Sequence, residues 1–236
     1  MSATNTYRSE IWSLLIFPTL LFALFNLLSE WREWDLKLSL WWFELESGTP
    51  ESGWPWRHSF IPDTLLHGGG HDLVVAIAVI VMVLIGLSWK VPRLTAARVP
   101  LSYLLLCFLL TVLLVGVLKS LTHVNCPWDL LPFGGSQIYV PTFSFLPDDV
   151  TPGRCFPGGH AAGGYGWIAL FFVARVYCPR LRWVALVSVL LLGGSFDLAQ
   201  QLRGAHFMSH GLWSLMIAWW IAASLYLLWF KRAAKD

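Results

Sequence analysis

The sequence predicts an all-α integral membrane protein, built as a bundle of six membrane-spanning helices. Of its 236 residues 56% are hydrophobic and 13% are charged, whereas soluble domains carry about 25% charged residues. The mean hydropathy is +0.61. Six stretches are also apolar over the roughly 20 residues that a bilayer-crossing helix needs. This composition excludes a soluble globular domain and a disordered chain.

The six predicted spans follow one another in a single domain, residues 1–236, without an internal repeat. None has the charged start and small-residue cleavage site of a removed signal peptide, so we expect none to be removed. The spans run approximately over residues 11–31, 73–89, 100–118, 161–176, 183–202 and 207–230.

Lys and Arg gather in alternate connections, which sets the predicted orientation. Basic residues lie before the first span, between spans two and three, between spans four and five, and after the last span, where Lys231, Arg232 and Lys235 follow. This side and both termini are therefore predicted to be cytoplasmic. We expect a bacterial inner membrane, with the other face periplasmic. A net charge of only +2 gives no case for binding nucleic acid.

The outer segment of residues 30–72 is rich in tryptophan, a residue favoured at the boundary of membrane and water. Residues 34–43 are predicted to form an amphipathic helix lying in that interface. We expect this segment to shape an entrance for lipid. Its tryptophans are Trp31, Trp34, Trp41, Trp42, Trp54 and Trp56.

Two of the four cysteines, Cys126 and Cys155, fall in one outer loop, where a disulfide is permitted. The bond would close a loop of about 30 residues and stabilise the fold by roughly 3–4 kcal/mol. The alternative is two buried free thiols. Cys107 lies inside a span and Cys178 on the cytoplasmic side, which excludes a metal site built from all four.

Three segments bring ionisable side chains to the predicted outer ends of spans. Lys119 leaves the third span, Arg154 precedes His160 at the fourth, and residues 203–210 enter the last. Arg203, His206 and His210 are spaced by three and four, which places them on one helix face. Ionisable groups at a membrane edge usually point inward and are functional.

Gly158 and Gly159 stand directly before a predicted helix, where free backbone N–H groups form an anion site. Lys and Arg beside such a site suit a phosphate. A histidine there can attack phosphorus, protonate a leaving oxygen or bind a metal. The residues therefore predict a phosphate-handling pocket with histidines.

The three segments, spanning residues 119–210, resemble the signature of the type-2 phosphatidic acid phosphatase superfamily. That signature is K-x6-R-P, then P-S-G-H, then S-R-x5-H-x3-D, on six-helix membrane proteins. Among the departures from it, Cys126 and Gln200 replace arginines, Gly158 replaces serine, and His210 replaces the aspartate. The matching residues are Lys119, Pro127, Pro157, Gly159, His160 and His206.

The resemblance implies a phosphohistidine mechanism without metal or cofactor, acting on a lipid phosphate or pyrophosphate. His206 would attack phosphorus and His160 would protonate the departing oxygen. Lys119, Arg203 and the amides of Gly158 and Gly159 would hold the phosphoryl oxygens.

The departures leave two functions of the family's residues to be supplied elsewhere. His210 can orient an imidazole but brings no negative charge, for which Asp197 or Asp129 would substitute. Arg154 would supply the missing guanidinium. In a second alignment His210 is the nucleophile and Ser214 takes the aspartate position.

Other interpretations remain open. The chain would instead be a lipid phosphotransferase of the same superfamily, or a lipid-binding or transport protein without chemistry. His206 and His210 have the spacing of zinc ligands, although no carboxylate partner is evident. Asp197 is expected to pair with Arg203. The pairs Gly163-Gly164 and Gly193-Gly194 are expected to allow close helix packing. The remaining histidines are expected in loops, and residues 67–71 are expected to form a flexible turn. These histidines are His58, His67, His71 and His123.

Overall fold

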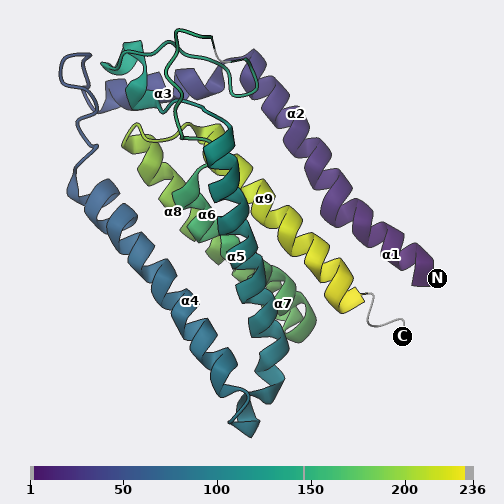
Figure 1. Cartoon of the computed structure of the whole chain (residues 1–236). Coiled ribbons are helices and arrows are strands. Elements are labelled where there is room, and N and C mark those ends of the chain that lie inside the picture. Colours follow the sequence, from purple (N-terminus) through teal and green to yellow (C-terminus); the bar gives the residue numbers. More distant parts are fainter. Residues whose placement is uncertain (1–2, 146, 232–236) are drawn as a thin grey trace.

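The computed structural model describes residues 3–145 and 147–231, which form helices and loops with no β-strand among them. Arg232 and Lys235, assigned above to the cytoplasmic side, lie outside the described residues. Figure 1 shows long helices in a bundle, with a layer of loops and one crosswise helix over one end.

The helical elements follow the order of the predicted spans. They are α1 (Ala3–Ile11), η1 (Trp12–Ile16), α2 (Phe17–Trp31), α3 (Trp34–Leu45), η2 (Phe60–Gly69), α4 (Gly70–Leu87), η3 (Pro92–Ala97), α5 (Arg98–Leu121), η4 (Pro127–Asp129), η5 (Leu131–Phe133), α6 (Gly159–Tyr165), η6 (Gly166–Ile168), α7 (Ala169–Tyr177), η7 (Pro179–Leu181), α8 (Arg182–Leu202), α9 (Met208–Tyr226) and η8 (Leu227–Lys231).

Within the described residues, five helices are long and apolar enough to cross a membrane. They are Tyr7–Trp31, Phe60–Leu87, Pro92–Leu121, Pro179–Leu202 and Met208–Phe230. The chain thus has the helices of an integral membrane protein, but the count of six is not confirmed. The stretch predicted as a span at 161–176 is divided into α6, η6 and α7. Glycines at 163, 164 and 166 weaken a regular helix there.

Apolar side chains cover the outside of the bundle. Leu27 on α2, Leu113 on α5 and Leu191 on α8 are each more than 60% exposed, as suits helices whose outer solvent is lipid. Buried side chains fill the inside of the bundle against one face of α5. Tyr103 on that helix is fully buried and donates a hydrogen bond of 2.7 Å to the carbonyl of Ala222 on α9.

α3, the helix predicted at 34–43, lies across one end of the bundle (Figure 1). Buried apolar side chains gather beneath this helix, apart from the core of the bundle. We call them the outer aromatic cluster: Phe43, Trp54, Leu130, Phe133 and Phe207. The first residues of α1 and the end of α9 lie at the opposite end (Figure 1). The cluster holds the turn between α8 and α9 in place, because Phe207 belongs to that turn.

Candidate active site

Lys119 and the start of α6 are brought together by the loop that joins α5 to α6. Thr122 Oγ1 donates a hydrogen bond to the carbonyl of Phe156, 2.5 Å away. The amide of Cys155 donates to the carbonyl of Val124. These bonds return the chain to the end of α5, so that Lys119 Nζ lies 3.8 Å from the point where a Cβ on Gly159 would stand. The missing side chain of Gly159 leaves room beside the ammonium group.

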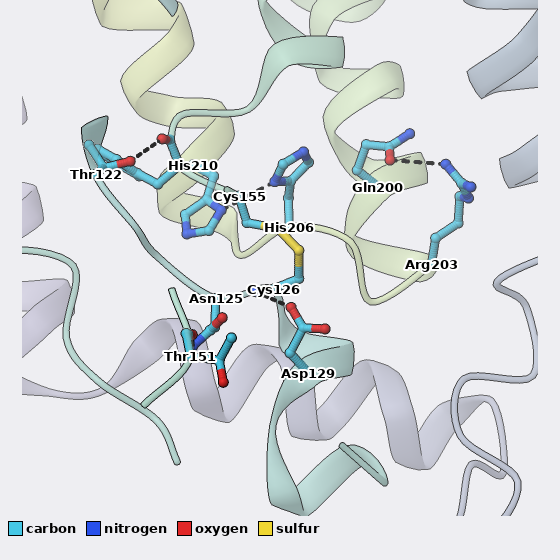
Figure 2. The surroundings of a disulfide bond; sticks show 11 residues. Thr122, Asn125, Cys126, Asp129, Thr151, Cys155, Gln200, Arg203, His206 and His210 are labelled. Carbon is cyan, nitrogen blue, oxygen red and sulfur yellow. Dashed lines mark hydrogen bonds between the residues drawn. A yellow bond between two sulfur atoms is a disulfide. The ribbon is translucent and has the colours of Figure 1, made fainter. Parts of the chain in front are cut away.

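Cys126 and Cys155 form a disulfide across this loop, with Cα atoms 5.3 Å apart (Figure 2). Asp129, proposed above to support the nucleophile, instead accepts a hydrogen bond from the amide of Cys126 at 3.0 Å. It caps a turn beside the disulfide and forms no hydrogen bond to either histidine of α9 or its preceding turn among the described residues.

His206 and His210 face each other through one ring nitrogen each (Figure 2), with the two Nδ1 atoms 3.2 Å apart. His206 lies in the turn before α9 and His210 lies one helical turn further on. Two ring nitrogens at this distance share one proton, so one imidazole must accept where the other donates. When His206 donates from Nδ1, its Nε2 carries the free lone pair of a nucleophile.

The surroundings keep His206 uncharged. Burial, the neighbouring His210 and the charge of Lys119 lower the pKa of His206 well below its usual value, while the backbone carbonyl of Cys155 opposes this shift. The same carbonyl faces His210. At neutral pH His206 is therefore unprotonated at one nitrogen, as attack on phosphorus requires. The zinc interpretation gains no third ligand: among the described residues, the one group with metal-ligand geometry is Cys126, Asp129 and Cys155, whose sulfurs are bonded to each other.

The backbone amide of Gly158 already donates a hydrogen bond within the protein. It donates to the carbonyl of His210 at 3.0 Å, and the Gly158 carbonyl accepts from Ser214 Oγ at 2.9 Å. The expectation that this amide holds a phosphoryl oxygen is therefore wrong for the structure described. These bonds instead lock the start of α6 to α9, which leaves the amide of Gly159 as the glycine donor beside Lys119.

His160 is held on three sides. Its Nε2 lies 2.9 Å from the carbonyl of Leu66, its ring stacks on Phe196, and the edge of His67 meets it with centroids 4.7 Å apart. A carbonyl only accepts, so Nε2 carries a proton and Nδ1 is the atom left for chemistry. Burial lowers the pKa of His160 to about 4, partly offset by the bond to Leu66.

Arg203 is bound within the protein rather than left open for a ligand. Its guanidinium pairs with Asp63 at 2.8 Å and donates to the carbonyl of Arg57 at 3.0 Å. It also donates to Gln200 Oε1 at 3.0 Å, the bond drawn in Figure 2. The expected pairing of Arg203 with Asp197 is wrong: Asp197 accepts from Gln201 at 2.9 Å and packs against the backbone of Gly211. Arg154 is exposed and forms no ion pair among the described residues.

Two residues that contact the site, Asp35 and His67, were not predicted from the sequence. Asp35, on α3, accepts a 2.9 Å hydrogen bond from the amide of Ser209 and so caps the N-terminus of α9. His67 lies in η2, a π-helical segment that continues into α4, and not in the flexible turn predicted at 67–71. A lone acid in an interfacial helix and a histidine before three glycines carry no sequence signal for these contacts.

An apolar cleft of about 390 Å³ opens between α4 and α5 beside these groups. Its apolar walls come from Val74, Val75, Phe108, Val112 and Phe196, while His67, Gly159 and His160 line its polar end. A cleft of this size and lining accommodates an apolar chain whose polar end reaches the histidines.

Breaking the disulfide is expected to lower the free energy of unfolding by roughly 3 kcal/mol. The bond joins cysteines 29 residues apart, and without it the unfolded chain is no longer restricted by this crosslink. Activity should also fall, since the carbonyl of Cys155 faces both imidazoles. Thermal unfolding of Cys155→Ala in detergent measures the first effect. The exposed free thiol of Cys178 supplies the control Cys178→Ala. Equal unfolding temperatures for the two variants would contradict the expectation.

The family comparison covers the part of the chain that carries these groups. A family model described as PAP2 superfamily matches residues 100–234, more than half of the 236 residues. The match runs from α5 to the end of the described chain and includes all three segments singled out in the sequence. No curated protein and no solved structure matches the chain.

Proposed function

The chain belongs to the PAP2 superfamily, and we propose that it is a membrane phosphatase that removes phosphate from a lipid phosphate or pyrophosphate through a phosphohistidine at His206. The observation that carries this proposal is the apolar cleft ending at Gly159 and His160. A lipid tail fits between α4 and α5 while its phosphate meets Lys119 and the histidines. The tryptophan-rich segment before η2 would border the same outer end.

In the proposed reaction, Nε2 of His206 attacks phosphorus, an N–P bond forms and the P–O bond to the lipid breaks. Nδ1 of His160 gives its proton to the departing oxygen, because Nε2 is held by Leu66. Protonation of Nδ1 depends on the negative charge of the bound phosphate, which opposes the effect of burial on this ring. His210 accepts the Nδ1 proton of His206, so the positive charge passes from the phosphohistidine to the His210 ring, which the carbonyl of Cys155 faces.

Water then attacks phosphorus while His160 takes its proton, and the N–P bond breaks to release inorganic phosphate. His210 returns the Nδ1 proton to His206, which restores the neutral ring. Lys119 and the amide of Gly159 stabilise the charge on the phosphoryl oxygens. We assign Arg203 to positioning Gln200 rather than to the phosphate. Arg154, exposed in the loop before α6, would attract the anionic headgroup.

We further propose that the site faces the periplasm of a bacterial inner membrane. The connections rich in arginine, residues 92–98 and 179–182, lie at the ends of α5 and α8 remote from Lys119 and Gln200. Basic connections of this kind are retained in the cytoplasm.

Phosphate release in detergent from a panel of lipid phosphates and pyrophosphates tests the function. We expect release by the wild-type protein, unaffected by a metal chelator, and much weaker release from glycerol phosphate, which has no tail for the cleft. Loss of activity with chelator would contradict the metal-free mechanism. A folded protein that forms a phosphoenzyme but releases phosphate only when an acceptor lipid is added would be a phosphotransferase, and one that does neither would be a binding protein.

A pair of neighbouring substitutions on α5 tests the route of the lipid. Val112 lines the cleft, whereas Leu113 is 64% exposed on the outer surface. Val112→Trp should fill the cleft and raise KM for long-chain substrates, while Leu113→Trp should leave it unchanged.

A further inference from the structure

We propose that His67 is an additional phosphate-binding residue, which donates a hydrogen bond from Nε2 to a phosphoryl oxygen held beside Lys119. This inference rests on the proposed function, because it adds a contact to the same site. No motif identifies His67, and its role follows from a series of contacts through Asp63, Arg203 and Gln200.

Gln200 sets the protonation of the His67 ring. Arg203 donates to Gln200 Oε1 at 3.0 Å, and since a guanidinium only donates, the amide oxygen must face Arg203. The amide nitrogen of Gln200 therefore faces His67 and lies 3.1 Å from its Nδ1. Nδ1 accepts this bond, so the neutral ring carries its proton on Nε2.

The same contacts fix the position of the ring. Arg203 is anchored to Asp63 at 2.8 Å, and Asp63 lies on η2 four residues before His67. The contacts run from Asp63 to Arg203, from Arg203 to Gln200 and from Gln200 to His67. They therefore begin and end on η2. A donor held in this way needs little reorganisation when an anion binds.

The Nε2 proton of His67 has no acceptor among the residues that the structure describes. Its ring is half-buried, lines the cleft with Gly159 and His160, and meets the His160 ring at 4.7 Å. Lys119, which lies beside Gly159, has no ion-pair partner in the described part of the chain. The unpaired ammonium group lies beside Gly159, and the unpaired N–H donor lines the same cleft as Gly159. Both are complementary to an anionic oxygen.

Binding of inorganic phosphate, followed by the thermal unfolding of the detergent-solubilised protein, tests the proposal without requiring turnover. Loss of one hydrogen bond to a charged group corresponds to roughly a 10- to 100-fold weaker Kd in His67→Ala. His67→Gln should bind more tightly than His67→Ala, because its amide also donates. His123, an exposed histidine in the loop after α5, gives the control His123→Asn with unchanged Kd, since asparagine tolerates its positive φ of 54°. kcat/KM for a lipid phosphate should fall in the same order.

A second measurement separates this role from a purely structural one. The ¹⁵N resonances of His67 should report a protonated Nε2 in the wild type, and Gln200→Leu should remove that preference and weaken phosphate binding.

Each outcome bears on one proposal or the other. Equal phosphate affinity in wild type and His67→Ala would overturn the role of His67 while wild-type lipid hydrolysis upheld the function. No lipid hydrolysis, with phosphate binding still weakened in His67→Ala, would support His67 and overturn the function. A wild type that phosphate does not stabilise at all would overturn the role of His67.

Discussion

His206→Ala is expected to reduce phosphate release by at least about 10³-fold, because no other group can form the N–P bond at that position. His210→Ala should cost less, on the order of 10²-fold, since it removes the acceptor for the Nδ1 proton but leaves the attacking Nε2. The two Nδ1 atoms are only 3.2 Å apart, so a difference in activity between the two variants reflects the chemical roles of the rings rather than their positions.

Trapping the phosphoenzyme at alkaline pH, where phosphohistidine persists, distinguishes the two histidines directly. We expect labelled phosphate on the wild type and on His210→Ala, and none on His206→Ala. The reverse pattern would assign the nucleophile to His210, as in the second alignment of the sequence. Thermal unfolding of each variant shows whether the fold is retained, with His123→Asn as the control for replacing an exposed histidine.

Gly164→Ala is expected to destabilise the protein by about 1–3 kcal/mol and to reduce turnover by on the order of 10²-fold. A Cβ on Gly164 would lie 2.5 Å from Gly193 Cα and 3.0 Å from the ring of Phe196, both on α8. The backbone of Gly193 cannot rotate away as a side chain can, so α6 must move from α8. His160 lies in the first turn of α6 and Gln200 in the last turn of α8, so their separation would also change.

Gly163→Ala is the matched control, one residue away on the same helix. A Cβ there would meet only the two methyl groups of Val74, at the ordinary contact distances of 3.7 and 3.9 Å. Alanine also favours helix by up to about 1 kcal/mol over glycine, so this variant should be as stable as the wild type or slightly more so. Unfolding temperature and phosphate release measure both variants. Equal losses in the two would refute the close approach of α6 and α8 as the cause.

The membrane class, the order of the spans and the family could all be predicted from local patterns. Long apolar stretches identify a helix independently of what packs against it, since lipid surrounds any span. The three segments with Lys119, His160 and His206 were also visible, because each has its own spacing. The family assignment made on them is confirmed by the match over residues 100–234. The roles assigned to the individual residues stay predictions.

The number of spans was less certain for a physical reason. Hydropathy counts apolar residues and ignores how closely two helices approach. The glycines that divide α6 from α7 permit contact with α8 at Gly193, and this contact, rather than membrane crossing as one regular helix, decides the local geometry. Of the glycine pairs predicted to allow close packing, Gly164 and Gly193 make the close approach, whereas Gly163 and Gly194 have only ordinary contacts.

The partners of the polar groups could not be predicted, because they come from segments far apart in the chain. Arg203 pairs with Asp63 rather than Asp197, and the Gly158 amide binds the carbonyl of His210. His67, expected in a loop, meets Gln200 from 133 residues away. A sequence shows which donors and acceptors exist, and burial favours a partner for most of them. Only the packing of the helices determines which partner lies within hydrogen-bond distance.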